Sequence, residues 1–237
     1  MSNRTMRLLA VSDLVQPQLY NNSLREWLPP VDLIISCGDL PRDYLDFLVS
    51  TLNVPLAHVI GNHCSLYHDP GTRRCNPDEY MGAFNLNAQV AEYKGLILAG
   101  IEGSPFYNGG PHQYSEMQIG WNLLKLTPLL LSEKMHSGRY LDVFVTHAPP
   151  RGIHDYDDVA HRGFELFCGF LQRFHPVLML HGHSHRYDPM KPTHTRFGRT
   201  EIINVFGHSL IELAWEEKSS SWKVLQTNSV EANHGSE

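Results

Sequence analysis

The sequence has few cysteines, no long apolar run and no excess of positive charge. Its four cysteines among 237 residues show no C-x-x-C spacing, which is typical of free thiols in a reducing compartment. No stretch approaches the ~20 apolar residues of a membrane span, and the apolar residues 8–11 are too few for the core of an export signal. We therefore expect a cytoplasmic protein that does not enter a membrane.

The charge balance limits the classes of binding partner. A formal net charge of -6 argues against a general nucleic-acid binder, which needs a basic face to neutralise phosphates. A phosphate-containing substrate remains compatible, because bound metal cations would reverse the local field. The length and the 42% of hydrophobic residues suit one large domain, predicted over residues 1–227, with 228–237 as a flexible tail.

Short apolar runs that end in polar residues alternate with stretches of helical periodicity. We expect buried strands at residues 7–12, 31–36, 56–60, 96–101, 141–146 and 177–180. Helices are predicted at residues 42–52, at 114–136 with a kink or break at Pro128, and at 161–174 before Pro176. Residues 193–224 read as strand-rich, and 69–78 as a loop. This alternation is typical of an α/β fold.

The polar residues that follow these strands are the main functional signal. Five strands deliver Asp, Asn or His at their carboxyl ends, which is the edge where open α/β sheets bind ligands. The residues are Asp13, Asp39, Asn62, His147, His183 and His185. The chain has 15 histidines, and ten of them lie between His136 and His208. Neutral imidazole is the commonest metal ligand in proteins.

The chemistry of this set favours a divalent metal site. Carboxylate, amide and imidazole ligands without thiolate suit Mn, Fe, Zn or Ni, with one or two ions per chain. One carboxylate can bridge two cations about 3.5–4 Å apart, and a shared hydroxide can then attack phosphorus. Glycines at positions 38, 61 and 182 permit sharp turns and close approach at the strand ends.

The order of these motifs resembles a known family. Gly38-Asp39, Gly61-Asn62-His63, a strand-end His147 and Gly182-His183-Ser184-His185 are arranged as in calcineurin-like metallophosphoesterases. The resemblance spans residues 7–204. It implies a four-layer αββα sandwich of two mixed β-sheets flanked by helices, and it implies phosphoester hydrolysis.

The resemblance also implies a role for each matching residue. Asp13 and His185 would bind a first metal, and Asp39 would bridge it to a second. Asn62, His147 and His183 would complete the second metal. His63 would act with Asp39 in catalysis, facing the substrate and stabilising the departing oxygen.

Two positions depart from the family pattern. The usual Asp-x-His is Asp13-Leu14-Val15 here, and valine cannot coordinate a metal. We expect the first site to bind its ion more weakly, or to use a neighbouring residue or water. Cys64 follows His63 where an acidic residue is common, and we interpret Cys64 as a packing residue.

Further residues are candidates for the rim of the site. His181 is interpreted as a partner that holds a ligand imidazole. Arg151 and Arg186 could meet a phosphate oxygen, or could be solvated surface arginines. The segment His161-Arg162-Gly163 could start a helix that faces an anion, or simply start a helix. Tyr67, Phe106 and Tyr107 could stack on a base, although the edge of the core is the favoured interpretation.

The leading hypothesis is a phosphoester hydrolase that uses a metal-activated hydroxide on a small phosphoester or nucleotide. A phosphodiesterase is favoured over a monoesterase, because His63 can help a poor alkoxide leaving group. The alternative is a catalytically weakened metal- or nucleotide-binding protein on the same scaffold, motivated by Val15. A nuclease component is disfavoured by the acidic charge. The sequence leaves the oligomeric state open.

Overall fold

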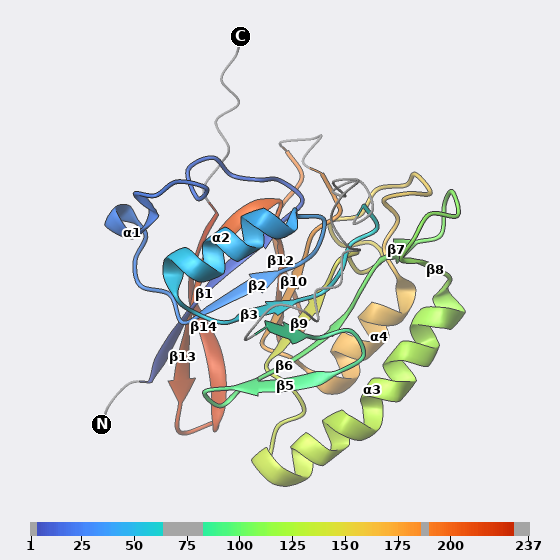
Figure 1. Ribbon diagram of the computed structural model, residues 1–237. Coiled ribbons are helices and arrows are strands. Elements are labelled where there is room, and N and C mark those ends of the chain that lie inside the picture. The colour runs from blue at the N-terminus through green and yellow to red at the C-terminus, as the bar shows by residue number, and fades with distance from the viewer. Residues whose placement is uncertain (1–3, 64–82, 186–189, 230–237) are drawn as a thin grey trace.

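The computed structural model describes residues 4–63, 83–185 and 190–229, and within them the chain forms two six-stranded sheets and a small two-stranded one (Figure 1). The first sheet has the order β14-β13-β1-β2-β3-β4 and the second has the order β11-β12-β10-β9-β6-β5. Strands β7 and β8 pair separately. The predicted α/β fold with two mixed sheets is confirmed.

The strands have the following bounds. In the first sheet they are β1 (Thr5–Ser12), β2 (Leu33–Ser36), β3 (Leu56–His58), β4 (Ala83–Asn85), β13 (Gly207–Glu216) and β14 (Ser221–Ser229). In the second sheet they are β5 (Val90–Tyr93), β6 (Leu96–Ile101), β9 (Val143–Thr146), β10 (Leu178–His181), β11 (His194–Phe197) and β12 (Thr200–Asn204). The small sheet consists of β7 (Ser104–Pro105) and β8 (Gln113–Tyr114).

The strands that precede the candidate ligands run parallel to their neighbours. In the first sheet β1 pairs in parallel with β2, and β2 with β3, while β13 is antiparallel to β1. In the second sheet β9 lies between β6 and β10, parallel to both. Parallel strands have their carboxyl ends at the same edge of a sheet. One edge of the first sheet therefore carries the loops that follow β1, β2 and β3, and one edge of the second sheet carries the loops that follow β9 and β10.

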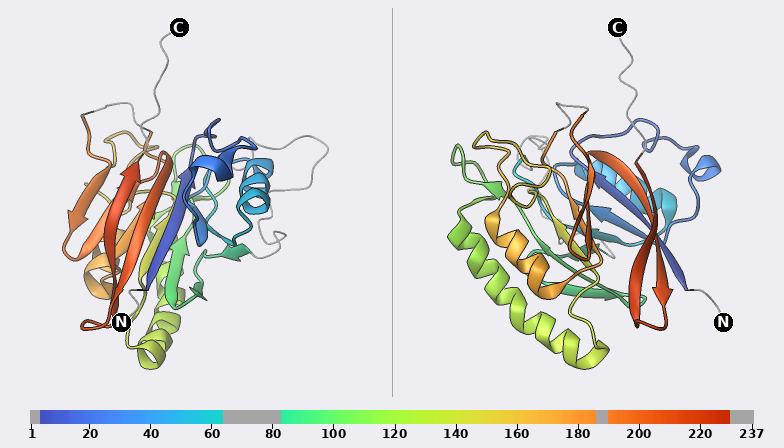
Figure 2. Two further views of the ribbon diagram at one scale, coloured as in Figure 1. Left: turned by 90° about the vertical axis from the view of Figure 1, so that its left-hand side faces the viewer. Right: turned by 180° about the vertical axis from the view of Figure 1, so that it is seen from behind.

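Successive side chains of a strand point to opposite faces of its sheet, so the apolar residues form three separate cores. These cores lie between four layers: helices, sheet, sheet and helices. Leu8 and Leu33 belong to the core between the two sheets, which also receives Val143 and Leu178 from the second sheet. The intervening residues of the first sheet face α1 (Leu24–Trp27) and α2 (Arg42–Leu52). Those of the second sheet face α3 (Glu116–Ser137) and α4 (Glu165–Phe174). Figure 2 shows α2 and the pair α3–α4 on opposite sides of the strands.

The long helix α3 starts and stops at defined signals. Ser115 and Gln118 form a reciprocal capping box at its start, and Gly138 ends it in a left-handed conformation. Pro128 lies inside α3, so the helix continues through the residue where we expected a kink or break. Thr127 Oγ1 donates to Leu123 O at 2.8 Å, one turn back along the same stretch.

Most predicted elements are confirmed with small shifts of their ends. Helix α2 has the predicted bounds, and β11 to β14 form the strand-rich C-terminal part. Helix α4 begins at Glu165 rather than at His161, because residues 158–161 are held in a loop described below. Strand β14 runs to Ser229. The predicted loop 69–78, with Cys64, Tyr67 and Arg186, lies outside the described residues.

Candidate metal centre

Three side chains from three different loops converge at the shared sheet edge. Asp39 follows β2, His147 follows β9 and His183 follows β10, and each is buried. Their candidate ligand atoms all lie within 4.8 Å of one another. These residues are far apart in sequence, and the two sheets bring them together. The group could therefore hold a divalent metal ion.

Hydrogen bonds select the imidazole atom of His147 that faces the group. Its Nδ1 donates to Cys37 O at 2.7 Å, which leaves Nε2 as the ligand atom. Nε2 lies 3.0 Å from Asn62 Oδ1 and 3.2 Å from Asp39 Oδ2. Asp39 Oδ2 is buried and has no hydrogen-bond partner within the described part of the chain. The contact of Asp39 Oδ2 with His147 is thus an ion pair, and carboxylate, amide and imidazole donor atoms that converge in this way fit a bound cation.

His183 is oriented by the loop that follows β9 and by Asp13. Its Nε2 donates to Ala160 O at 2.6 Å, which leaves Nδ1 as the ligand atom. Its backbone N–H donates to both carboxylate oxygens of Asp13, at 3.1 and 3.0 Å. Asp13, Asp39 and His183 all have positive φ, at 61°, 56° and 64°. Such backbone costs about 1–3 kcal/mol per residue and is concentrated at functional sites.

Two glycines allow the carboxylates to approach the backbone. A Cβ at Gly61 would lie 2.0 Å from Asp39 Oδ1, and a Cβ at Gly182 would lie 2.3 Å from Asp13 Oδ2. No side chain fits at either position without moving a carboxylate. The structure thus shows side chains of the site close to these two glycines, whereas the predicted approach of a substrate stays a prediction.

Asp13 and His185 lie beside the three-residue group as a second pair. The Asp13 side chain is 1% exposed, and its Oδ1 is 4.0 Å from His185 Nε2. His185 is more open to solvent, at 37%. Asp13 also touches the buried group through the His183 amide. This arrangement is compatible with a second ion next to the first, but with fewer imidazoles around it.

Asn62 and His63 both contact residues of the buried group. Asn62 directs Oδ1 toward His147, while its Nδ2 donates to Tyr107 OH at 3.0 Å. The backbone N–H of His63 donates to Asp39 Oδ1 at 2.8 Å. Tyr107 therefore orients a candidate ligand, a role that its loop position in the sequence did not reveal.

Burial and opposite charge set the protonation states of the group. Burial would raise the pKa of Asp39, but the neighbouring His147 lowers it to about 2. Burial would lower the pKa of His147, but the Asp39 carboxylate raises it to about 9. Burial lowers the pKa of His183 to about 3. Burial also raises the pKa of Asp13. Without a metal, the group therefore holds a proton on His147 that balances Asp39.

Metal binding is expected to release this proton. The pKa of His147 is raised from the ordinary 6.5 to about 9. Below pH 9 a proton therefore competes with the metal for the imidazole of His147, and above pH 9 it does not. Affinity for Mn²⁺ should rise about tenfold per pH unit between pH 7 and 9. Calorimetric titration in buffers of different ionisation enthalpy measures the protons released. A pH-independent affinity with no proton release would contradict this electrostatic account.

A chain of neutral imidazoles lies behind the group. Thr195 Oγ1 donates to His154 Nε2 at 2.9 Å, and His154 Nδ1 donates to His181 Nε2 at 2.9 Å. His181 Nδ1 is 3.0 Å from Gly182 O. Burial lowers the pKa of His154 to about 4 and that of His181 well below its ordinary value, which keeps both rings neutral. His181 thus contacts the backbone carbonyl of Gly182, which directly precedes the candidate ligand His183.

The candidate rim residues have mixed outcomes. Arg151 Nη1 pairs with Asp155 Oδ2 at 3.3 Å, and its role toward a phosphate stays a prediction. His161 is not at a helix start; its ring lies against His183 and His185, with centroids 5.2 and 5.9 Å apart. The sequence signalled His161 only as the start of a predicted helix that could face an anion, and not as a neighbour of His183 and His185.

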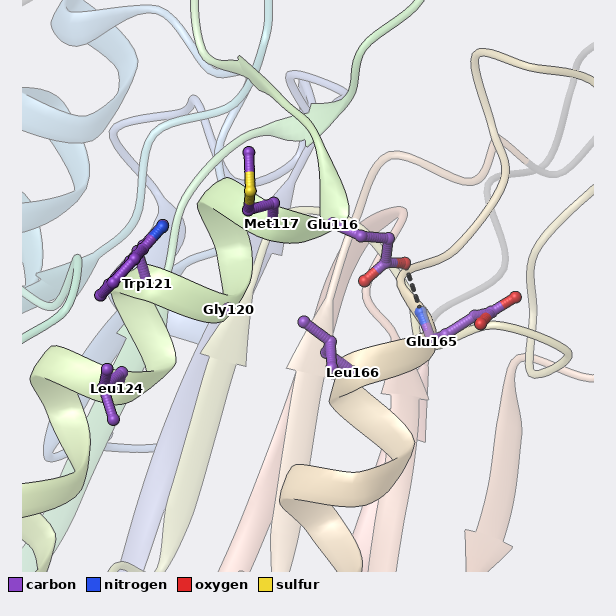
Figure 3. A pocket seen from close by; sticks show the side chains of 7 residues that line it. All are labelled: Glu116, Met117, Gly120, Trp121, Leu124, Glu165 and Leu166. Atoms are coloured by element: carbon purple, nitrogen blue, oxygen red, sulfur yellow. Dashed lines mark hydrogen bonds between the residues drawn. The ribbon is translucent and has the colours of Figure 1, made fainter.

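An apolar cavity of about 520 Å³ lies elsewhere, on the outer helical layer. Figure 3 shows Met117, Trp121 and Leu124 along α3, with Leu166 of α4 pointing toward α3 near Gly120. At its polar end Glu165 N donates to a carboxylate oxygen of Glu116 at 2.7 Å. This cavity contains none of the candidate metal ligands.

Among the described residues, no helix has both the length and the apolar character of a membrane span.

Comparisons with known proteins agree with this geometry. The sequence pattern described as calcineurin-like phosphoesterase matches residues 6–187, which is more than half of the chain. A search of curated proteins gave no match.

Solved structures with low sequence identity share the fold over nearly their whole length. A crystal structure with 14% identity covers 94% of this chain and 99% of its own, with a TM-score of 0.60. TT1561 of Thermus thermophilus has 15% identity, coverages of 95% and 99%, and a TM-score of 0.58. Vacuolar Protein Sorting 29 from Cryptosporidium parvum is a more distant match, with 11% identity, coverages of 95% and 99%, and a TM-score of 0.44.

Proposed function

Because this chain belongs to the calcineurin-like phosphoesterase family, we propose that it is a metal-dependent hydrolase of small phosphoesters or nucleotides, with a preference for phosphodiesters. The observation that carries the proposal is the buried convergence of Asp39, His147 and His183, whose ligand atoms lie within 4.8 Å of one another. Burying a carboxylate costs free energy, and a bound cation would offset that cost more fully than the contact with His147 alone.

The ligand assignment follows the contacts. Asp13 with His185 would hold the first metal, and His147, His183 and the amide oxygen of Asn62 would hold the second, with Asp39 shared by both. Mn, Fe, Zn or Ni suits this oxygen and nitrogen set. A bound ion would activate a water for attack on phosphorus and would neutralise charge on the non-bridging oxygens.

His63 is assigned to the leaving group. Its backbone N–H holds Asp39 Oδ1, so its position is coupled to that of the metal ligands. Its side chain is partly exposed, whereas His147 and His183 are buried. An imidazole at the open side of the group can donate a proton or a hydrogen bond to a departing alkoxide. This help matters most for diesters with poor leaving groups, which is the basis of the proposed preference.

A second candidate is a metal- or nucleotide-binding protein with little turnover. Its motivation is Val15, which occupies the position of the usual histidine and packs against the apolar cluster beneath α2. Metal content separates the two candidates. One tightly bound ion per chain with no turnover supports the binder, whereas two ions, or one ion with turnover, support the enzyme.

The direct test is hydrolysis of bis-p-nitrophenyl phosphate by purified protein with added Mn²⁺. We expect metal-dependent turnover of this diester that exceeds turnover of p-nitrophenyl phosphate. His63→Ala should lower diester turnover about 10²–10⁴-fold, the usual contribution of a general acid, without changing Mn²⁺ content. Protein that binds divalent ions yet stays inert on a panel of mono- and diesters would contradict the hydrolase and favour the binder.

A further inference from the structure

The metal assigned to Asp13 and His185 has fewer histidine ligands than its neighbour. The second ion would have two histidines, His147 and His183, whose ring centroids are 4.9 Å apart. The first metal would have a single histidine, His185, because Val15 is apolar and packs against the core cluster beneath α2. A site of this donor type needs another nitrogen or oxygen ligand to bind its ion firmly.

His161 lies beside both histidines of the Gly182-His183-Ser184-His185 motif. It belongs to the loop between β9 and α4, and its ring centroid is 5.9 Å from that of His185 and 5.2 Å from that of His183. Metal–nitrogen bonds of about 2.0–2.1 Å put the centroids of two imidazoles on one ion about 5–6 Å apart. The spacing of His161 and His185 is therefore compatible with two imidazoles on one ion, as is the shorter spacing of His161 and His183.

The loop around His161 sets the ring's tautomer. Asp158 Oδ1 accepts hydrogen bonds from His161 Nδ1 at 2.9 Å and from the backbone amides of Ala160 and His161 at 3.1 and 3.0 Å. With Nδ1 donating to a carboxylate, Nε2 carries the lone pair that a metal uses. A carboxylate behind the distal nitrogen of a histidine is the usual arrangement around metal-ligating imidazoles.

The same loop is fixed to the other ligands. Ala160 O accepts from His183 Nε2 at 2.6 Å, and Tyr156 OH donates to His185 O at 2.9 Å. Tyr156 N in turn donates to His161 O at 3.1 Å. The loop therefore positions His161 relative to both histidines of the Gly182-His183-Ser184-His185 motif.

We propose that His161 supplies the imidazole that Val15 does not, so that the first metal is held by Asp13, Asp39, His185 and His161, with Asp158 as the carboxylate that orients His161. This inference rests on the proposed function, since it completes the same metal centre. It also explains how the site tolerates valine at position 15.

The test is the Mn²⁺ content and affinity of His161→Ala, measured by elemental analysis and calorimetric titration. Wild-type protein should bind two ions per chain. His161→Ala should keep one and bind the other at least about 100-fold more weakly, and Asp158→Asn should weaken the same ion about 10–100-fold. His136→Ala is the control, because His136 lies in the last turn of α3 and is exposed. It should behave as wild type.

A rescue variant keeps the test informative if His161→Ala perturbs the loop. Val15→His in the His161→Ala background should restore the first metal, because it returns an imidazole to the ion held by Asp13 and His185. Equal metal content and affinity in His161→Ala and His136→Ala would overturn the inference, while leaving the hydrolase proposal intact. Wild-type protein that binds no divalent ion would instead contradict the proposed function itself.

Discussion

Substitution of Asp39 by alanine should remove bound metal and lower phosphodiester hydrolysis at least about 10³-fold, since metal stabilisation of the transition state is worth several kcal/mol and each 1.36 kcal/mol is tenfold in rate. Asp39 is the carboxylate of the buried group, and its Oδ2 faces His147 at 3.2 Å. Without it, two buried imidazoles remain with no anionic ligand between them. Metal content by elemental analysis and turnover of bis-p-nitrophenyl phosphate measure the two effects.

Asp46→Ala is the matched control for this substitution. Asp46 lies on α2, pairs with Arg42 at 3.4 Å and has a half-exposed side chain, so its loss should leave metal content and turnover unchanged. Asp39→Asn adds a second comparison, because it keeps the shape and removes the charge. Retention of wild-type metal content by both Asp39 variants would place the metal elsewhere.

Substitution of Gly61 by alanine should produce a loss of metal affinity of at least about 100-fold, as expected when ligand geometry is disturbed. The added Cβ would lie 2.0 Å from Asp39 Oδ1 and 2.8 Å from Asp39 N, so both the carboxylate and the backbone must move. Overpacking of this kind costs about 1–3 kcal/mol of stability. Calorimetric Mn²⁺ titration and thermal unfolding report the two losses.

Gly169→Ala separates crowding at the site from a general effect of replacing glycine. Gly169 lies within α4, and a Cβ there would have no neighbour within 4 Å. Alanine should stabilise that helix by about 0.5–1 kcal/mol and leave metal affinity unchanged. If Gly61→Ala bound metal as tightly as Gly169→Ala, the close approach of Asp39 to the backbone would not matter for the site.

The sheet strands and the ligands at their ends could be predicted from the sequence because each signal is local. An apolar run that stops at Asp39 or His147 shows both the buried strand and the edge at which it ends. The bounds of α2 were likewise predictable from helical spacing. The order of these motifs then implied which loops meet.

Contacts made between loops could not be predicted in the same way. His161 and Tyr107 reach the site through loops whose paths depend on side-chain hydrogen bonds, to Asp158 and Asn62. No periodicity encodes such paths. The start of α4 was misplaced for the same reason, because Asp158 holds residues 160 and 161 in a turn. Pro128 was expected to disturb α3, yet that helix is continuous.

One measurement tests the central claim most directly: a crystal structure of the protein with Mn²⁺, with the ions located by anomalous scattering. The account predicts a peak between the side chains of Asp39, His147 and His183, at bonding distance from all three. Manganese bound only at other positions, with this group still linked by hydrogen bonds alone, would contradict it.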